Sequence, residues 1–359
     1  MKRDRLTIGM LLGIPLMQLI LFGFAINMNP RHLPTALVVL DHSPQTRDFV
    51  TALENTKYFD IKVANTSEAE AERLLARGTV TFIVRIPAGF TRSMIRGENP
   101  SMMVVADATD PAATGNAIAA LNTLADTVFN QSFSYDGLNY LHTNSPPFDL
   151  VIHSKYNPEA KTQYNIVPGL MGVILTMTMV MITGMAITRE RELGTMENLL
   201  ASPVRPIEVM LGKILPYIIV GYVQQILILL AAIYVFNVPI YGSFWLLSAM
   251  TLPFLIANLT VGLTFSAVAQ TQLQAMQMTF FFFLPSILLS GFMFPFYGMP
   301  DWAQYLGELL PLTHYLRIVR GIILKGNDFI AIWQDLWPML LFILIVGFIC
   351  LKRYRQTLE

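Results

Sequence analysis

Charged residues are scarce in this sequence. Only 13% of its 359 residues are charged, whereas 54% are hydrophobic, and about a quarter of the residues in a typical soluble domain are charged. The net charge is zero and no long basic block is present, which argues against nucleic acid as a partner. This composition is typical of a protein embedded in lipid.

Cysteine and catalytic motifs are equally scarce. Cys350 is the only cysteine, so no disulfide can form within the chain. The five histidines lack the spacing of a metal site, and no paired carboxylates stand on a common intramembrane face. No G-x-x-x-x-G-K-[ST] phosphate loop occurs, because Gly212-Lys213 is followed by Ile214. We therefore expect a chain that is not itself an enzyme and holds no metal or cofactor.

Long uncharged runs occupy much of the chain. A helix that crosses the hydrocarbon core of about 30 Å needs roughly 20 apolar residues. Six runs predict six membrane-spanning helices, the last of which is short but can be extended by residues 331–337. These runs are Leu6–Ile26, Ile166–Thr188, Ile214–Phe236, Ser243–Ala269, Ala275–Phe296 and Leu336–Leu351.

The first run has the basic start and apolar stretch of a secretory signal peptide. It is 21 residues long, however, and no A-x-A-like cleavage site follows it before Asn27. We therefore interpret residues 1–27 as an uncleaved transmembrane anchor.

Residues 28–165 have the composition of a soluble domain, with fourteen acidic and eleven basic residues. Short β-branched segments predict four strands, and two polar segments predict helices, the first with Ser67 as its cap and Gly78 as its stop. The predicted strands are Ala36–Asp41, Tyr58–Ala64, Val80–Pro87 and Ser101–Ala108, and the predicted helices are Ser67–Gly78 and Ala112–Phe133. The chain is thus predicted to be an α-helical polytopic membrane protein with an inserted extracytoplasmic α/β domain between its first and second spans.

The distribution of lysine and arginine predicts the orientation in the membrane. Basic residues flank the spans closely on one side, which the positive-inside rule places in the cytoplasm together with both termini and the tail 352–359. These residues are Lys2, Arg3, Arg5, Arg189, Arg191, Arg205, Lys213, Lys352, Arg353 and Arg355. Arg317, Arg320 and Lys325 would then lie outside, in an external re-entrant or interfacial region 297–330.

One cytoplasmic segment, Arg189–Glu208, concentrates seven charged side chains in twenty residues between two long uncharged runs. Thr195 can cap a short helix over 196–201, and Pro206 suits the first position of a second helix that runs toward Lys213. A solvated linker is the simpler reading of such a loop. The apolar face of Met196, Leu199 and Leu200 beside capped ends instead favours a helix-turn-helix that docks on a partner.

These residues resemble the membrane subunits of type 2 ATP-binding-cassette (ABC) exporters, in which a segment of the form RE-E-GT-E-L---P seats in a groove of the ATPase subunit. Further similarity extends over Tyr156–Glu159, Val167–Gly169, Pro87–Phe90 and the first span, although family members usually carry an amphipathic helix ahead of the residues matched by Arg3-Asp4-Arg5. The matching residues of the predicted coupling loop 189–213 are Arg189, Glu190, Glu192, Gly194, Thr195, Glu197, Leu200, Ser202 and Pro203.

The resemblance implies an exporter permease of the bacterial inner membrane. A separate ABC ATPase subunit would bind ATP and Mg²⁺ and move the coupling loop. Six spans make half a permease, which implies a second copy or a homologous permease as partner. A periplasmic adaptor is a further implied partner of the external domain, and the implied cargo is amphipathic or hydrophobic, such as drugs.

Other polar and sulfur-containing residues within the spans are candidates for the path of the cargo. Met177 and Met181 lie on one face of the second span, and Gln224, Gln225 and Asn258 lie in the middle of later spans. Methionine suits varied apolar ligands, although ordinary packing and amide bonds between helices explain such residues equally well.

The helix predicted over Pro311–Leu324 places its apolar residues on one face and His314, Arg317 and Arg320 elsewhere. This pattern favours an amphipathic helix in the outer membrane interface, where membrane lipids would bind at the exit rim.

Two other classes of function are alternatives. A membrane-anchored sensor would bind a ligand in its external domain, but it needs fewer spans. An ion-coupled secondary transporter is expected to hold carboxylates within its spans, and the predicted spans contain none.

Overall fold

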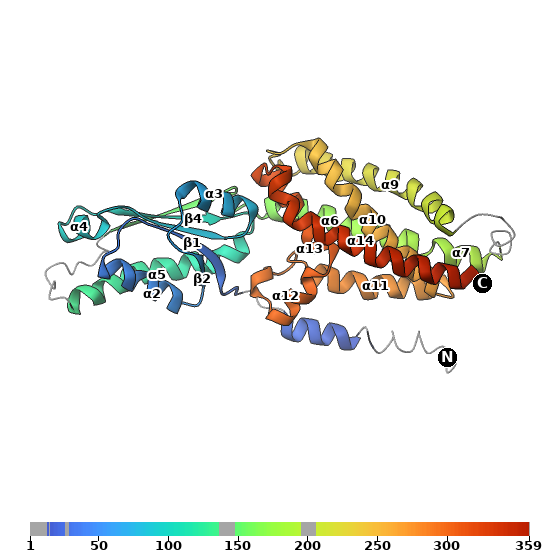
Figure 1. The fold of residues 1–359 in the computed structure, drawn as a ribbon, viewed down its shortest axis with the longest axis horizontal. Coiled ribbons are helices and arrows are strands. Elements are labelled where there is room, and N and C mark those ends of the chain that lie inside the picture. The colour runs from blue at the N-terminus through green and yellow to red at the C-terminus, as the bar shows by residue number, and fades with distance from the viewer. Residues whose placement is uncertain (1–12, 14, 26–28, 136–147, 195–205, 359) are drawn as a thin grey trace. The chain divides into compact units, whose positions relative to one another are not determined.

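The computed structural model describes residues 13, 15–25, 29–135, 148–194 and 206–358 (Figure 1). The chain divides into two compact units. Unit 1 comprises Met1–Ile26 and Ile166–Glu359, and unit 2 comprises Asn27–Asn165.

Unit 2 is built on a five-stranded sheet in the order β2-β1-β3-β4-β5. The pairs β1/β2, β1/β3 and β4/β5 are parallel and β3/β4 is antiparallel. The strands are β1 (Leu33–Val39), β2 (Phe59–Val63), β3 (Phe82–Ile86), β4 (Ser101–Asp107) and β5 (Asp149–Lys155). The four predicted strands correspond to β1 to β4, whereas β5 is an edge strand that we did not predict.

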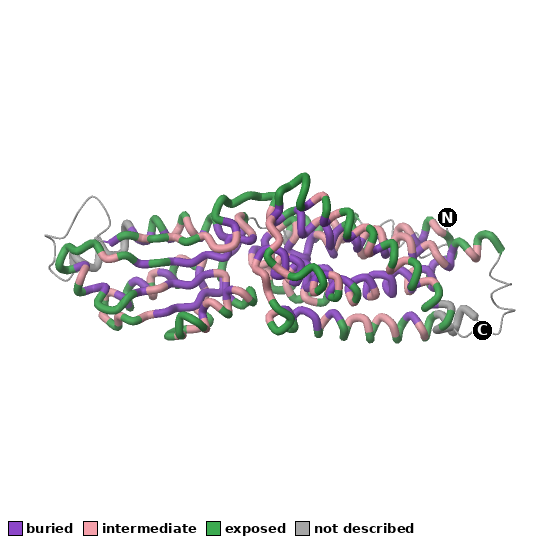
Figure 2. The backbone as a smooth tube through the Cα atoms, turned by 90° about the horizontal axis from the view of Figure 1, so that it is seen from above, coloured by how far each residue is buried: buried purple, intermediate pink, exposed green. Residues whose placement is uncertain are grey.

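The sheet of unit 2 carries helices on both faces (Figure 1). On one face, Ala71 and Leu75 of α3 pack against Val38 and Ile83 of the sheet, while α2 and α5 cover the other face. The three central strands β1, β3 and β4 are largely buried, whereas the edge strands β2 and β5 are mostly half-buried or exposed (Figure 2). The helices are α2 (Pro44–Asn55), α3 (Glu68–Arg77), α4 (Phe90–Ile95) and α5 (Pro111–Tyr135).

The caps of α3 confirm the prediction for that helix. The Ser67 hydroxyl accepts a hydrogen bond from the amide of Glu70, and Gly78 ends the helix with a left-handed backbone, φ 76°. A serine that bonds an otherwise unpaired first-turn amide and a glycine with positive φ are local signals. Helices α2 and α4 were not predicted.

Unit 1 is helical. Five helices among the described residues are long and apolar enough to cross a membrane, with boundaries Thr162–Glu192, Met210–Tyr234, Phe244–Val268, Gln272–Leu289 and Phe329–Arg353. The first predicted span, Leu6–Ile26, is described at residue 13 and over residues 15–25, where residues 15–20 are helical and lead into the π-helical turn η1 (Leu21–Ala25). Its other residues lie outside the described part of the chain. The elements of unit 1 are α6 (Thr162–Gly184), α7 (Ala186–Glu192), α9 (Pro206–Tyr234), α10 (Phe244–Val268), α11 (Gln272–Leu289), η3 (Phe296–Gly298), α12 (Asp301–Glu308), α13 (Pro311–Lys325) and α14 (Phe329–Leu358).

Helix α10 lies at the centre of unit 1, packed against α9, α11, α13 and α14. Its Phe254 ring stacks on Tyr315 of α13 with centroids 3.9 Å apart, and the Tyr315 hydroxyl lies 2.9 Å from that of Thr251. A Cβ on Gly262 would stand 1.9 Å from the Thr183 hydroxyl oxygen of α6. Only glycine therefore permits this approach, which is a common device for packing membrane helices.

Several predicted boundaries in unit 1 were wrong. The helix that begins at Pro206 does not end near Lys213 but continues as the span, so that α9 is one helix. The fifth span was expected to reach Phe296, yet α11 ends at Leu289, before Gly291 adopts a φ of +79°. Uncharged composition cannot reveal such ends, because turns in an apolar region are apolar too.

Helix α13 is also not the interfacial amphipathic helix that we expected. Every residue of α13 is buried except Arg317, Arg320 and Lys325, because the helix packs between α10 and α14 and its Leu312 and Tyr315 lie against Gly172 of α6. The apolar face predicted the helix, but the remaining sides are covered by protein.

Candidate functional site

The charged segment leaves the helical bundle through α7. Arg189, Glu190 and Glu192 lie on α7, and Gly194 follows it with a φ of +72°. The side chains of Arg189 and Glu192 are exposed. The remaining predicted coupling residues lie outside the described residues, namely Thr195, Glu197, Leu200, Ser202 and Pro203.

Helix α7 begins where α6 ends, and its first amides are bonded to another helix. The Ser266 hydroxyl oxygen of α10 accepts hydrogen bonds from the amides of Ile187 at 2.8 Å and Thr188 at 3.2 Å. First-turn amides have no partner within their own helix. Ser266 therefore acts as a cap supplied from a different span, which fixes the start of α7 on α10.

The end of α7 is bonded to the turn between α10 and α11. Arg191 donates to the carbonyl of Ala269, the C-cap of α10, at 2.7 Å. The Glu192 carboxylate accepts from the first amide of α11, that of Gln272, also at 2.7 Å. A cation at a helix C-terminus and an anion at a helix N-terminus both oppose the charges of the helix dipoles. These two contacts hold the turn to α7.

A third contact ties α7 to α9. Lys213 donates to the carbonyl of Ala186 at 2.7 Å and lies 3.7 Å from the Glu190 carboxylate. The arrangement of α7 with Lys213, Ser266, Ala269 and Gln272 is called the α7 junction below. Its charged side chains bond mainly to backbone groups at helix ends, so α7 is attached to the three spans α9, α10 and α11.

Sequence reasoning found only part of the α7 junction. Arg191 was predicted only as a basic residue on the cytoplasmic side, and no role was predicted for Gln272. Ser266 was not identified at all. Their partners lie about 80 positions away in the sequence, and no local pattern predicts a pairing at that separation.

The candidate residues of the cargo path lie on three helices. Met177 and Met181 of α6 are half-buried, and Gln224 of α9 lies 2.8 Å from the Thr178 hydroxyl of α6. Gln224 was predicted either to line a cargo path or to bond to a neighbouring helix, and this contact is a bond of the second kind.

The two other amides that were predicted as candidates for a cargo path, Gln225 and Asn258, are fully buried. Gln225 has no hydrogen-bond partner for either side-chain atom among the described residues. Asn258 donates to the carbonyl of Phe254 at 2.9 Å, and its side-chain oxygen has no partner in the same part of the chain. Buried polar atoms usually have partners. The unmet groups of Gln225 and Asn258 can therefore bond to a polar group that enters the bundle.

The residues of the predicted exit rim have protein partners. His314 is buried and lies 3.1 Å from Asp335, and Arg317 is paired with Glu308. Arg320 donates to the carbonyl of Gly291 at 3.3 Å. Asp335 lies within α14 and is 6% exposed. The prediction that the spans hold no carboxylate was therefore wrong, because the extension of the final span over residues 331–337, which we also predicted, contains Asp335.

A search against protein-family models matches residues 5–352 to the family described as ABC-2 family transporter protein. Similar curated proteins include the probable multidrug ABC transporter permease YbhR of Escherichia coli (strain K12), 27% identical over 354 residues, which cover 99% of this chain and 95% of the relative.

The inner membrane transport permease YhhJ of the same organism is 27% identical, with 96% of this chain and 93% of the relative covered. The ABC transporter G family member 20 of Dictyostelium discoideum is 26% identical, with 99% of this chain but only 50% of the relative covered.

Proposed function

Because this chain belongs to the ABC-2 transporter family, we propose that it is the membrane-spanning permease subunit of an ABC exporter that moves amphipathic or hydrophobic cargo. The names of two Escherichia coli relatives, the probable multidrug ABC transporter permeases YbhR and YbhS, support this role. So do the five helices of spanning length in the described part of the chain.

The α7 junction is the observation that carries the proposal. An exporter of this kind needs a rigid connection between a cytoplasmic contact and its spans, since a coupled motion requires contacts that differ between two states. The charged segment 189–205 begins on α7, and α7 is bonded to α9, α10 and the start of α11. A force applied to the segment reaches three spans at once.

The partners and location follow from the same proposal. A separate ABC ATPase binds ATP and Mg²⁺ and contacts the charged segment. A second copy of the chain or a homologous permease completes the transporter in the bacterial inner membrane, with both termini cytoplasmic. Unit 2 lies in the periplasm, where it shapes the exit or contacts an adaptor protein.

The buried amides support a cargo path that is not uniformly apolar. Gln225 and Asn258 present unmet polar groups inside the bundle, while Met177 and Met181 supply flexible, half-buried apolar surface on α6. An amphipathic molecule matches both kinds of group, because its polar end can satisfy the amides and its apolar part can contact thioethers.

The Glu197→Arg variant tests the coupling role. We expect transport by the reconstituted complex to be lost while the melting temperature of the permease is unchanged, because a reversed charge disrupts a docking surface without touching the spans. Glu98→Arg, the same reversal at an exposed position of unit 2, is the control and should transport normally. Wild-type transport together with wild-type binding of the ATPase in Glu197→Arg would refute the assigned role.

A further inference from the structure

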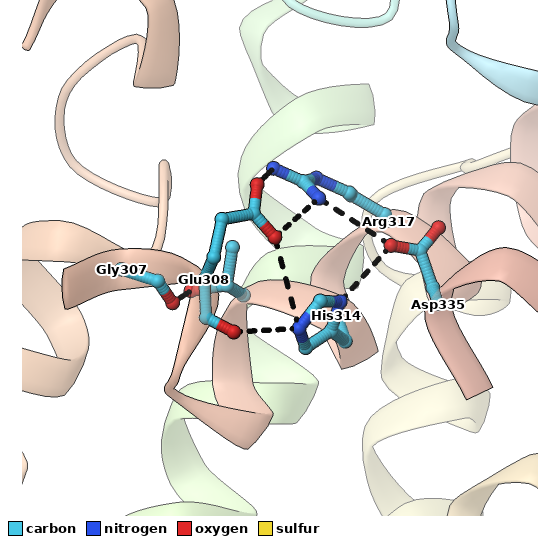
Figure 3. Close-up of polar contacts among 6 residues, drawn as sticks. Gly307, Glu308, His314, Arg317 and Asp335 are labelled. Carbon is cyan, nitrogen blue, oxygen red and sulfur yellow. Dashed lines mark hydrogen bonds and ion pairs between the residues drawn. The ribbon is translucent and has the colours of Figure 1, made fainter. Parts of the chain in front are cut away.

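Four charged or titratable side chains meet where α12, α13 and α14 come together (Figure 3). Glu308 is the last residue of α12, His314 and Arg317 lie on α13, and Asp335 lies on α14. Arg317 contacts the Glu308 carboxylate through both terminal nitrogens, at 2.5 and 3.1 Å, and lies 3.4 Å from Asp335. We call these four residues the His314 cluster.

The imidazole ring of His314 has an oxygen atom beside each of its nitrogens. Nδ1 lies 3.1 Å from Oδ1 of Asp335, and Nε2 lies 2.9 Å from the backbone carbonyl oxygen of Glu308 (Figure 3). A carbonyl and an ionised carboxylate can only accept hydrogen bonds, and a neutral imidazole has a single N–H. One of the two contacts would therefore place a lone pair against a lone pair.

The neighbouring groups cannot supply the missing hydrogen. Arg317 faces the same carboxylates, but its guanidinium is bonded to Glu308 and Asp335 and does not contact the ring. His314 is only 4% exposed and Asp335 only 6%. The cluster contains two carboxylates and one permanent cation, so it has a net charge of −1 unless another proton is present. The Glu308 and Arg317 side chains are partly exposed, at 41% and 37%, so the unbalanced charge is unfavourable chiefly at Asp335, where the carboxylate is buried beside the ring.

We propose that the His314–Asp335 pair is a proton-binding site. One proton, shared by Nδ1 and Oδ1, is bound in addition to the single N–H of a neutral ring. Whether it resides on the ring or on the carboxyl, both contacts of His314 are then satisfied and the cluster is neutral. When two titratable groups lie within hydrogen-bonding distance, the bound proton is assigned to the pair as a whole and not to either residue alone.

The bound proton fastens the α12–α13 hairpin to α14. Glu308 and the backbone of α12 face the ring from one side, Asp335 faces it from α14, and Arg317 is its charged neighbour on α13. Among the described residues these are the charged groups around the ring. Loss of the proton leaves two acceptors opposed and one charge unbalanced at the joint, which weakens the attachment of the hairpin. The proposal does not depend on the identity of the cargo or on the ATPase.

The Asp335→Asn variant removes the need for the proton with almost no change of shape. An amide at position 335 can donate to Nδ1, while a neutral ring donates from Nε2 to the Glu308 carbonyl. Asp328→Asn makes the same substitution at an exposed site immediately before α14, and it is the matched control.

The experiment measures thermal unfolding of the full-length permease from about pH 6 to about pH 9, around and above the ordinary titration range of imidazole. If the folded wild type binds a proton that the unfolded chain releases, its unfolding equilibrium constant rises by up to tenfold per pH unit relative to Asp335→Asn. Asp328→Asn should follow the wild type. Parallel pH dependence of wild type and Asp335→Asn would overturn the proposal.

A second measurement decides the matter if Asp335→Asn does not fold. In wild-type permease labelled with ¹⁵N-histidine, with His314→Gln used to identify the resonance, His314 should show two protonated ring nitrogens. If only one ring nitrogen of His314 is protonated, the carboxyl of Asp335 should carry the proton. The infrared spectrum should then show the band of a protonated carboxyl, and this band should shift in a sample with isotope-labelled aspartate. A singly protonated ring beside an ionised carboxylate would overturn the proposal.

Discussion

The two ends of unit 1 use charged residues in opposite ways. At the α7 junction, Arg191, Glu192 and Lys213 bond to carbonyl and amide groups at the ends of other helices. In the His314 cluster, at the other end of α14 from the C-terminus, charged side chains bond chiefly to one another. The first arrangement fixes the positions of helix ends, and the second depends on a balance of charge.

The difference has a consequence for how each region responds to change. A side chain that caps a helix end is backed by the whole dipole of that helix, and water can replace it at an exposed site such as Glu192. A buried ion pair has no such replacement, and the removal of one partner leaves the other charge desolvated. We therefore expect the junction to tolerate substitution with loss of coupling and the cluster to lose stability.

The largest expected effect is that of Asp335→Ala, which breaks the cluster from the α14 side. Removal of one partner of a buried pair costs about 3–5 kcal/mol, because Arg317 and the proton-bearing ring lose their carboxylate. The melting temperature of the purified permease should fall markedly. Leu344→Ala, at a site of α14 that is 71% exposed, is the control. If both variants lower the melting temperature equally, the loss cannot be attributed to the buried ion pair, and the contrast between the His314 cluster and the α7 junction is not supported.

Glu192→Ala should have a smaller effect on stability and a larger effect on transport. Glu192 is exposed, so water can replace the hydrogen bonds that its carboxylate loses, and the melting temperature should change little. Transport per ATP hydrolysed should fall, because the α10–α11 turn is released from α7. In Glu190→Ala, the ratio of transport to ATP hydrolysis should fall less, because the Glu190 carboxylate lies 3.7 Å from Lys213. A wild-type ratio of transport to hydrolysis in Glu192→Ala would argue against force transmission through this contact.

Asp41 in unit 2 is a carboxylate that bonds to backbone amides outside the spans, and it tests how much such bonds contribute to stability. Burial raises the pKa of its carboxyl, but hydrogen bonds from the amides of Thr91 and Ser43 and from their side chains outweigh burial, and the pKa is lowered from its ordinary value. A lowered pKa stabilises the fold above the pKa of the unfolded chain, and this contribution is lost as the pH falls through the folded value.

Asp41→Asn should therefore remove a small acid-dependent part of the stability of unit 2, below about 1 kcal/mol because water screens a partly exposed group. The acid unfolding of unit 2 is measured in the full chain. It is monitored by hydrogen exchange, as the loss of protection of the backbone amides of Thr91 and its neighbours. Asp60→Asn, at a surface ion pair with Lys62, is the matched control. Steeper acid unfolding in Asp41→Asn than in the wild type would contradict the assigned direction.

The smallest effect is expected for Arg73→Ala on α3, which removes a pair between exposed side chains. The Arg73 guanidinium lies 3.4 Å from Glu70, one turn away. Pairs of this kind contribute about 0.2–0.5 kcal/mol and are weakened by salt. The melting temperature should change little, and any change should disappear at high salt. If Arg73→Ala lowers the melting temperature as much as Glu192→Ala does, and equally at low and high salt, then exposure does not determine how much these ion pairs contribute to stability.

Several features of the fold could be predicted because their causes are local. Uncharged runs located the five described spans, since the thickness of the hydrocarbon core fixes a minimum length of apolar helix. Ser67 and Gly78 located the ends of α3 through contacts within one turn. The edge strand β5, by contrast, follows a segment that separates it from β4 by more than 40 residues, and its residues form a strand by pairing with β4.

The sequence by itself determined that this protein spans a membrane, and it located the charged segment that interrupts the spans, because both depend on composition and spacing along the chain. Only the tertiary structure decided which charges meet. Asp335 and His314 are 21 positions apart and Glu192 and Gln272 are 80 apart, and each pair exists because helix packing brings its members together. A lone charge in an apolar run has no identified partner until the helices are packed, and that partner decides whether the charge fixes a helix end or balances another charge.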